Sequence, residues 1–462
     1  MNTPTSPSVR RRHFRRHLLL AAAVAASALA LVLPPAASHE SEQYTLPVGR
    51  DFADLGPYFS NIFFDAIVGA VAEANAAIAS SIEGRQGAAP LSELHSSDYI
   101  AGKVWEHVFA AIPANELLDA QLVSEPVQSQ YPGLVTMYRP VQSIYDDPLL
   151  IIDLTKVVRT FFRAGTVSAG GEVFGTDKLI HFFNLGRIYH AKYETRIHRG
   201  MPEQDAIKSA IASTSRNFLT SEAGLLGMMS TGIHSNGDLA ADYSGLLFYR
   251  NLTETIRVGN RTLPPMLARD GEFWRVQVQR DSDFLTAFIT PHWNETLNPN
   301  KYVRYTAGRI RTLVKERCAD AIDWYRDPRG QKRGRIQFET IHQQLSSFYG
   351  ADYGHEVNDK GAVTMAAVCF SDSDATAAAS EAGSPDPLGR STLWWAARSG
   401  DAAAISRAAL APGEINVADA DGETPLHAAT RAGSAAAVRE LLARGADPNR
   451  ADRYGVTPLM LA

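Results

Sequence analysis

The sequence predicts a mainly α-helical protein in which a large helical region precedes a short solenoid of paired helices. Two observations carry this prediction. Apolar residues recur at helical spacing through most of residues 45–370, and residues 388–462 repeat with a period of 33. Of the 462 residues, 45 % are apolar and 21 % charged, which is typical of globular protein. The length favours more than one domain, because a single core rarely grows this large.

Residues 1–38 are typical of a secretory signal peptide. Five arginines within residues 10–16 precede an uncharged run over residues 18–33, and the small residues Ala36 and Ser38 follow. The uncharged run is shorter than the roughly 20 residues that a membrane-spanning helix needs. We therefore predict a bacterial protein exported to the periplasm or the medium, cleaved after Ser38, with no stable membrane span afterwards. A membrane anchor that is not cleaved is the alternative.

The arginines leave the export route open. Arg11 and Arg12 resemble the core of a twin-arginine signal, which implies export of a folded chain. Any arginine-rich leader contains such pairs, so the general secretory route is the alternative.

The charge balance argues against nucleic-acid partners. The chain carries 45 basic and 50 acidic residues, and loss of the five leader arginines changes the formal charge from −5 to −10. Binding to nucleic acid or to anionic lipid needs a basic surface, so we expect neither.

The middle region, residues 39–370, is predicted to be a mostly helical domain of unknown function. Residues 371–387 are rich in Ala, Ser, Asp and Pro and are predicted to be a linker. Two short segments are typical of strands, Leu134–Tyr138 and Phe273–Val278. Helices are predicted over residues 59–78, 100–109, 149–162, 177–198, 203–219, 303–325 and 336–348.

Five residues of the middle region form a candidate catalytic cluster. Asp177 and His181 lie four residues apart, and so do Asp238 and Asp242. Residues at this spacing share one face of a helix. If the two helices meet, imidazoles and carboxylates come together, and such a set can hold a divalent metal or orient a histidine as a general base. The alternative is structural, because acids complement helix N-termini and histidines are often hydrogen-bonded core residues. The cluster comprises Asp177, His181, His234, Asp238 and Asp242.

The motifs around this cluster bear a family resemblance. Residues 177–182 read Asp-Lys-x-x-His-Phe, and residues 238–245 read Asp-x-x-Ala-Asp-x-x-Gly. Both are similar to motifs of VanZ-like proteins and of small bacterial envelope lipoproteins. VanZ-like proteins span the membrane several times, whereas no such spans are predicted here, so the resemblance implies no catalytic residue.

Residues 388–462 contain a repeat. Glycines at 389, 422 and 455 lie 33 residues apart, and residues 421–429 read Asp-Gly-Glu-Thr-Pro-Leu-His-Ala-Ala. This segment resembles an ankyrin repeat. The resemblance implies paired helices that bind proteins and have no catalytic activity. Two complete repeats and a truncated third fall short of the usual three, so either the chain is a fragment of a longer array or the middle domain supplies the missing packing.

The turns that project from the repeats are the predicted protein-binding residues. In the alternative interpretation they are only solvated turn residues. They are Ala420, Asp421, Glu423, Arg453 and Tyr454.

The two cysteines, Cys318 and Cys369, are predicted to form a disulfide, as exported proteins with two cysteines usually do. Two buried thiols are the alternative.

The leading functional hypothesis is an exported protein that binds a partner through its repeats. The alternative is a metal-dependent hydrolase that uses the Asp/His cluster and carries the repeats as a targeting arm. Whether the chain is an enzyme stays open, and no cofactor is predicted beyond that divalent metal. In a third hypothesis the repeats pack against the protein's own body, burying Trp394 and Trp395 there.

Overall fold

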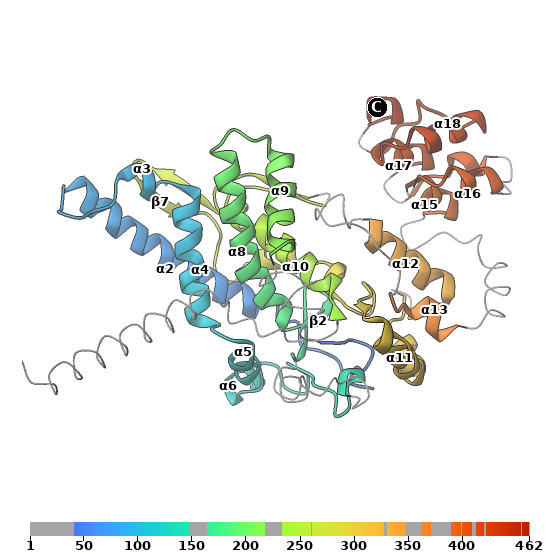
Figure 1. Cartoon of the computed structure of the whole chain (residues 1–462), viewed down its shortest axis with the longest axis horizontal. Coiled ribbons are helices and arrows are strands. Elements are labelled where there is room, and N and C mark those ends of the chain that lie inside the picture. Colours follow the sequence, from blue (N-terminus) through green and yellow to red (C-terminus); the bar gives the residue numbers. More distant parts are fainter. Residues whose placement is uncertain are drawn as a thin grey trace, which may run out of the picture.

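Helices dominate the structure, a computed structural model of the chain (Figure 1). The mainly helical fold class predicted from the sequence is therefore confirmed. The signal peptide and the linker predicted at 371–387 lie outside the described residues. The structure describes residues 41–146, 164–217, 233–259, 261–327, 330–347, 362–370, 390–398, 400–408, 413–419, 422–453 and 455–461.

Most predicted helices of the body are present. Those predicted to begin at residues 177, 203, 303 and 336 begin within one residue of those positions, whereas the one predicted at 149–162 lies outside the described residues. The helices are α2 (Gly56–Ile82), α3 (Leu91–Leu94), α4 (Ser97–Ala111), α5 (Asn115–Leu122), α6 (Glu125–Gln128), α8 (Asp177–Ile197), α9 (Glu203–Ser215), α10 (Asn236–Asn251), α11 (Arg304–Trp324), α12 (Arg335–Ser347) and α13 (Met365–Cys369), with 3-10 turns η1 (Ile144–Asp146), η3 (Phe284–Phe288) and η4 (Pro291–Trp293).

In the described part of the chain the strands form four separate antiparallel pairs, and one strand prediction was wrong. Phe273–Val276 is a strand as predicted, but Leu134–Tyr138 makes only isolated bridges, through Val135 and Tyr138. Gly133 turns the chain before this segment with a φ of 81°, and Pro140 after it has no N–H to continue a ladder. The pairs are β1 (Thr166–Ala169) with β2 (Glu172–Gly175), β3 (Ile233–His234) with β8 (Lys301–Tyr302), β4 (Ile256–Val258) with β5 (Arg261–Leu263), and β6 (Leu267–Asp270) with β7 (Phe273–Val276).

The main core lies where α2, α8 and α10 meet. Phe63 of α2 places its ring 5.7 Å from that of Phe182 on α8 and 5.4 Å from that of Phe248 on α10. Trp293 closes the cluster, with its ring 5.5 Å from Phe182. All four rings are fully buried. Aromatic pairs in tilted and edge-on contact of this kind stabilise a core beyond the area they bury.

Two glycines let α8 and α10 touch along their backbones. A Cβ atom on Gly186 would lie 2.5 Å from the Cα of Gly245, and a Cβ atom on Gly245 would overlap the carbonyl oxygen of Phe182. Because neither residue has a side chain, the helices lie side by side along their length (Figure 1). This contact brings the first turns of the two helices, which carry the predicted acidic residues, close together.

Gly245→Ala is expected to lower the free energy of unfolding by about 1–3 kcal/mol, because the added methyl group forces the two helices apart. Urea unfolding followed by circular dichroism measures the change. Gly308→Ala in α11 is the matched control, since its Cβ atom would meet nothing within 4 Å. That control is expected to leave stability unchanged or to raise it slightly, because alanine favours a helix. Equal effects of the two substitutions would contradict the backbone contact.

Helix α2 has the length and composition of a membrane span, although no membrane span is predicted from the sequence after the signal peptide. Its most apolar stretch has a mean hydropathy of 1.6. Core helices pass the same test, and Phe59, Phe63 and Ile67 on α2 are fully buried within the protein. We therefore describe α2 as a helix of the core.

A second core joins α11, α12 and α13. Val314 on α11, Phe338 on α12 and Met365 on α13 are buried in it together. A disulfide between Cys318 and Cys369 connects α11 to α13, with 5.3 Å between the two Cα atoms. The predicted disulfide is thus present, and it closes a segment of the chain 51 residues long.

The repeats have a core of their own. Leu393, Ile405, Leu426 and Leu441 from four successive helices are buried in it. Thr424 begins α17 with a capping box that it forms with His427. The elements are α15 (Thr392–Arg398), α16 (Ala402–Arg407), η5 (Glu414–Asn416), α17 (Pro425–Arg431), α18 (Ala435–Ala443) and α19 (Pro458–Leu461).

Candidate functional site

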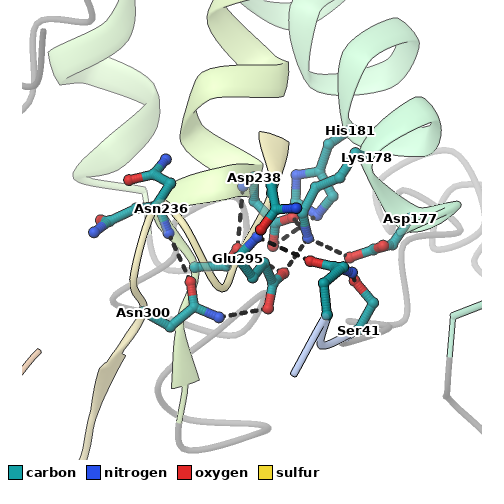
Figure 2. Close-up of polar contacts among 12 residues, drawn as sticks. Ser41, Asp177, Lys178, His181, Asn236, Asp238, Glu295 and Asn300 are labelled. Carbon is teal, nitrogen blue, oxygen red and sulfur yellow. Dashed lines mark hydrogen bonds and ion pairs between the residues drawn. The ribbon is translucent and has the colours of Figure 1, made fainter. Parts of the chain in front are cut away.

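The first turns of α8 and α10 and the loop after η4 meet at a buried cluster of charged side chains (Figure 2). Asp177 begins α8, and Asp238 lies in the first turn of α10, capped by Ser235, whose hydroxyl accepts a hydrogen bond from the Asp238 N–H at 3.1 Å. Glu295 comes from the loop. The glycine contact between α8 and α10 therefore carries the two predicted acids to one place.

Lys178 lies at the centre of this cluster. Its Nζ atom is 2.6 Å from Oδ2 of Asp177 and 2.6 Å from Oδ1 of Asp238, and it also donates to Oε1 of Glu295. The lysine side chain is completely buried. Figure 2 shows the three carboxylates directed toward this one ammonium group.

His181 lies one turn along α8, between two aspartates of α10. Its Nδ1 atom is 3.0 Å from Oδ1 of Asp242, and its Nε2 atom is 3.5 Å from Oδ2 of Asp238. Tyr189 donates a hydrogen bond of 3.4 Å to the other oxygen of Asp242. The structure thus brings Asp177, His181, Asp238 and Asp242 together, as the helical spacing predicts.

Glu295 is held by neutral groups as well as by the lysine. Ser235 donates a hydrogen bond of 3.1 Å to Oε1, and Asn300 donates to Oε2. The backbone N–H of Glu295 donates to the Gln43 side chain at 2.9 Å. Segments far apart in the sequence therefore converge on one carboxylate.

His234 does not join the cluster. It lies in β3, opposite Lys301 of β8, and its Nδ1 atom has no hydrogen-bond partner among the described residues. Burial and the charge of Lys301 lower its pKa to about 4, so the imidazole is neutral at pH 7.

Sequence reasoning missed the roles of Lys178 and Glu295. Lys178 belongs to the motif at 177–182. A lysine next to an acid in the sequence is typical of a surface ion pair, and no residue pattern around Lys178 predicts that it is buried. Glu295 is 53 residues from Asp242, the nearest cluster member in the sequence (295 − 242 = 53), and no periodicity links a loop residue to two helices.

Negative charge exceeds positive charge in the cluster. Asp177, Asp238, Asp242 and Glu295 face one lysine and one histidine, and each of these six side chains is at most 3 % exposed. Desolvation by burial raises the pKa of Glu295 to about 7 and that of Asp242 to about 6. Burial alone would lower the pKa of His181, but Asp238 and Asp242 outweigh it and raise the pKa to about 9. Retained protons thus offset part of the excess negative charge.

The carboxylates do not fit a resident divalent metal. One oxygen atom from each of Asp177, Asp238 and Glu295 lies within 4.8 Å of the others, a spacing that suits a metal ion. Lys178 contacts all three of these carboxylates, so its ammonium group already provides the positive charge between them. A cation placed there would have to displace a lysine that is fully buried. The geometry favours an ionic network that holds helices together.

The pKa of His181 predicts a fall in stability between pH 7 and pH 9. Its pKa is about 9 in the folded protein and about 6.5 unfolded, so the folded state binds the proton more tightly. This stabilisation is complete below the unfolded pKa and is lost as the pH rises through the folded pKa. We expect a loss of about 2 kcal/mol in the free energy of unfolding across this range.

The measurement is urea unfolding at pH 7, 8 and 9. His234 and His292, whose pKa values are lowered to about 4, act only below this range. The pKa of Glu295, raised to about 7 by burial, adds only a small loss just above pH 7. His181→Gln should remove most of the pH dependence. A wild-type protein that is equally stable at pH 7 and pH 9 would contradict the raised pKa of His181.

The repeat turns are a second candidate site. Asp419 and Asp452, 33 residues apart, fold their turns in the same way: their side chains accept the backbone N–H groups of Glu423 and Val456, each at 2.9 Å. Of the predicted binding residues, Glu423 forms an ion pair of 2.7 Å with Arg431 and is only partly exposed, whereas Arg453 is exposed. The other three lie outside the described residues: Ala420, Asp421 and Tyr454.

The first repeat is closed by its own tryptophans. Trp394 is buried in the core of the repeats, and Trp395 packs against the same core. The guanidinium group of Arg390 lies 4.6 Å from the Trp394 ring and 5.4 Å from the Trp395 ring, in cation–π contact. These side chains therefore cap the repeats. Burial of Trp394 and Trp395 against the body was the observation that would favour the third hypothesis, and the tryptophans pack within the repeats instead.

Comparison with known proteins identifies the repeats and leaves the body unassigned. The family model for ankyrin repeats matches residues 393–462, as three copies. No curated protein matches the chain. No finding supports the resemblance of the motifs in α8 and α10 to VanZ-like proteins. The ankyrin-repeat prediction is confirmed for the carboxyl end.

Proposed function

We propose that this is an exported bacterial protein that binds another protein through its ankyrin repeats, with the helical body as the scaffold that carries them. Ankyrin repeats typically mediate protein binding, and the match to them at residues 393–462 is the observation that carries the proposal. The proposed contact surface is the set of turns around Glu423 and Arg453.

The construction of the repeats supports this role. Their core consists of their own residues, and the turns at Asp419 and Asp452 are fixed by hydrogen bonds. Arg444, the residue that follows α18, donates hydrogen bonds to the carbonyl oxygens of Ile405 and Ala408 at the end of α16, which connects consecutive repeats. A rigid surface loses little conformational entropy on binding, so such turns suit recognition of a protein.

Export is supported by the disulfide. Bonds such as Cys318–Cys369 persist in oxidising compartments and are rare in the bacterial cytoplasm. The leader at residues 1–38, with its arginines and apolar run, is the second support.

The hydrolase hypothesis finds no comparable support. Four of its five candidate residues meet, all but His234, but Lys178 lies between the carboxylates. Burial leaves the side chains of Asp177, His181, Asp238 and Asp242 at most 3 % exposed. A hydrolytic site must admit water and substrate to its reacting groups. We therefore assign the cluster a structural role.

A pull-down tests the binding function. The full chain should recover a partner that a chain ending at Ser371 does not. In the full chain, Arg453→Glu at a repeat turn should lower recovery about tenfold, as loss of one well-placed interface arginine does. Arg439→Glu, an exposed residue of α18 away from the turns, is the charge-matched control and should have little effect. Equal recovery by the full and the truncated chain would show that the repeats do not bind the partner.

A further inference from the structure

The first described residues of the chain are buried. Ser41, Glu42, Gln43 and Tyr44 are between 0 and 4 % exposed, although chain termini usually lie at the surface. If the signal peptide is cleaved after Ser38, Ser41 is the third residue of the mature protein (41 − 38 = 3). The predicted cleavage site therefore lies three residues before a segment enclosed by the fold.

This segment, Ser41–Tyr44, is held by parts of the protein that are remote in sequence. The Tyr44 hydroxyl donates to the backbone oxygen of Val363 at 3.2 Å, and Tyr325 donates to the backbone oxygen of Gln43 at 3.0 Å. Gln43 in turn accepts the backbone N–H of Glu295 in the charged cluster. The segment cannot leave without opening the second core and uncovering Glu295.

Glu42 closes a tight turn within the same segment. Its Oε2 atom accepts the backbone N–H groups of Tyr44 at 2.7 Å and Thr45 at 2.9 Å, and its Oε1 atom accepts the Ser143 hydroxyl at 3.2 Å. A protease binds an extended, accessible stretch on both sides of the bond that it cleaves. In the folded protein a buried turn begins three residues after Ser38 in the sequence, at Ser41.

We infer that the signal peptide is removed before the body folds, so that the chain crosses the membrane unfolded, by the general secretory route rather than as a folded protein by the twin-arginine route. This inference rests on the proposed export. Arg11 and Arg12 are then part of the basic region of a general secretory signal peptide and not a twin-arginine motif.

The disulfide supports the same order of events independently. The core that receives Tyr44 is the one that Cys318–Cys369 closes, since Tyr44, Val363 and Met365 are buried together in it. A chain folded in the reducing cytoplasm would lack this bond, whereas a chain that folds after export can form it. The disulfide thus indicates that this core reaches its final, crosslinked form outside the cytoplasm.

Expression of the full precursor in a bacterium tests the inference. Azide, which inhibits the motor ATPase of the general secretory route, should cause unprocessed precursor to accumulate. A host without the twin-arginine translocase should process and export the protein at an unchanged rate, and so should Arg11→Lys combined with Arg12→Lys in a normal host. Processing that resists azide but fails in the translocase-deficient host or in the double variant would overturn the inference while leaving export intact. A precursor that stays intracellular and uncleaved under all conditions would contradict export itself.

Cleavage of purified precursor gives a second test. The folded, oxidised precursor should be cut by signal peptidase in detergent at least tenfold more slowly than a variant with a flexible Gly/Ser spacer of about ten residues inserted after Glu40. Equal rates would mean that the buried segment does not protect the bond, which would overturn the inference.

Discussion

Lys178→Met is expected to lower the free energy of unfolding by about 3–5 kcal/mol, the largest effect of any single substitution considered. Methionine preserves most of the side-chain volume but removes the ammonium group that contacts Asp177, Asp238 and Glu295. Three carboxylates would then lie buried without their cation, and breaking a buried ion pair by removing one partner has this order of cost. Urea unfolding at pH 7, followed by circular dichroism, measures the loss.

Lys103→Met is the matched control. Lys103 also contacts two carboxylates, at 2.7 Å from Glu73 and 2.8 Å from Glu106, but those side chains are 47 % and 52 % exposed. Solvent screens such pairs, so we expect a loss below about 1 kcal/mol.

A rescue variant keeps the test interpretable if Lys178→Met does not fold. Adding Glu295→Gln removes one of the three carboxylates that have lost their cation. It should restore part of the free energy of unfolding. Equal losses for Lys178→Met and Lys103→Met would show that the cluster is not an ionic network that holds α8 and α10 together.

Removal of the disulfide is expected to have the second largest effect. Cys318→Ala combined with Cys369→Ala should lower the free energy of unfolding by about 4 kcal/mol, because the crosslink restricts the unfolded chain over a separation of 51 residues. The loss should be concentrated in α11–α13, where hydrogen exchange of the backbone amides would rise, while exchange in the repeats should not change.

Reduction of the wild-type protein is the control for this double variant. Wild type treated with a reductant should resemble the variant in both stability and exchange, since neither has the crosslink. If the variant instead loses less than about 1 kcal/mol, the bond does not constrain this part of the fold.

The sequence predicts most of what depends on periodicity. The helices that contain Asp177 and Asp238, their shared faces with His181 and Asp242, and the 33-residue repeat all follow from local spacing. The disulfide follows from a count of two cysteines. Such features need no knowledge of how distant segments meet.

What depends on tertiary contact is beyond the sequence. Nothing near Lys178 predicts that it is buried, because its burial depends on Gly186 and Gly245, which let two helices approach, and on a loop that delivers Glu295. The burial of Ser41–Tyr44 cannot be predicted from the sequence either, since the residues that hold this segment lie more than 100 positions away in the chain. The apolar pattern of Leu134–Tyr138 predicts a strand, but the segment pairs only at Val135 and Tyr138, and local pattern does not show whether a neighbouring strand pairs along its whole length.

The most direct test of the account is photo-cross-linking from a repeat turn in the exporting cell. A photoreactive amino acid at position 453, in place of exposed Arg453, should form a crosslink to a second protein, and the same residue in place of Val141, which is 98 % exposed on the body, should not. We expect one discrete product, which should disappear when the turn variant is expressed in a cell whose gene for that second protein is truncated. Crosslinks from position 453 only to residues of the protein's own body would contradict it.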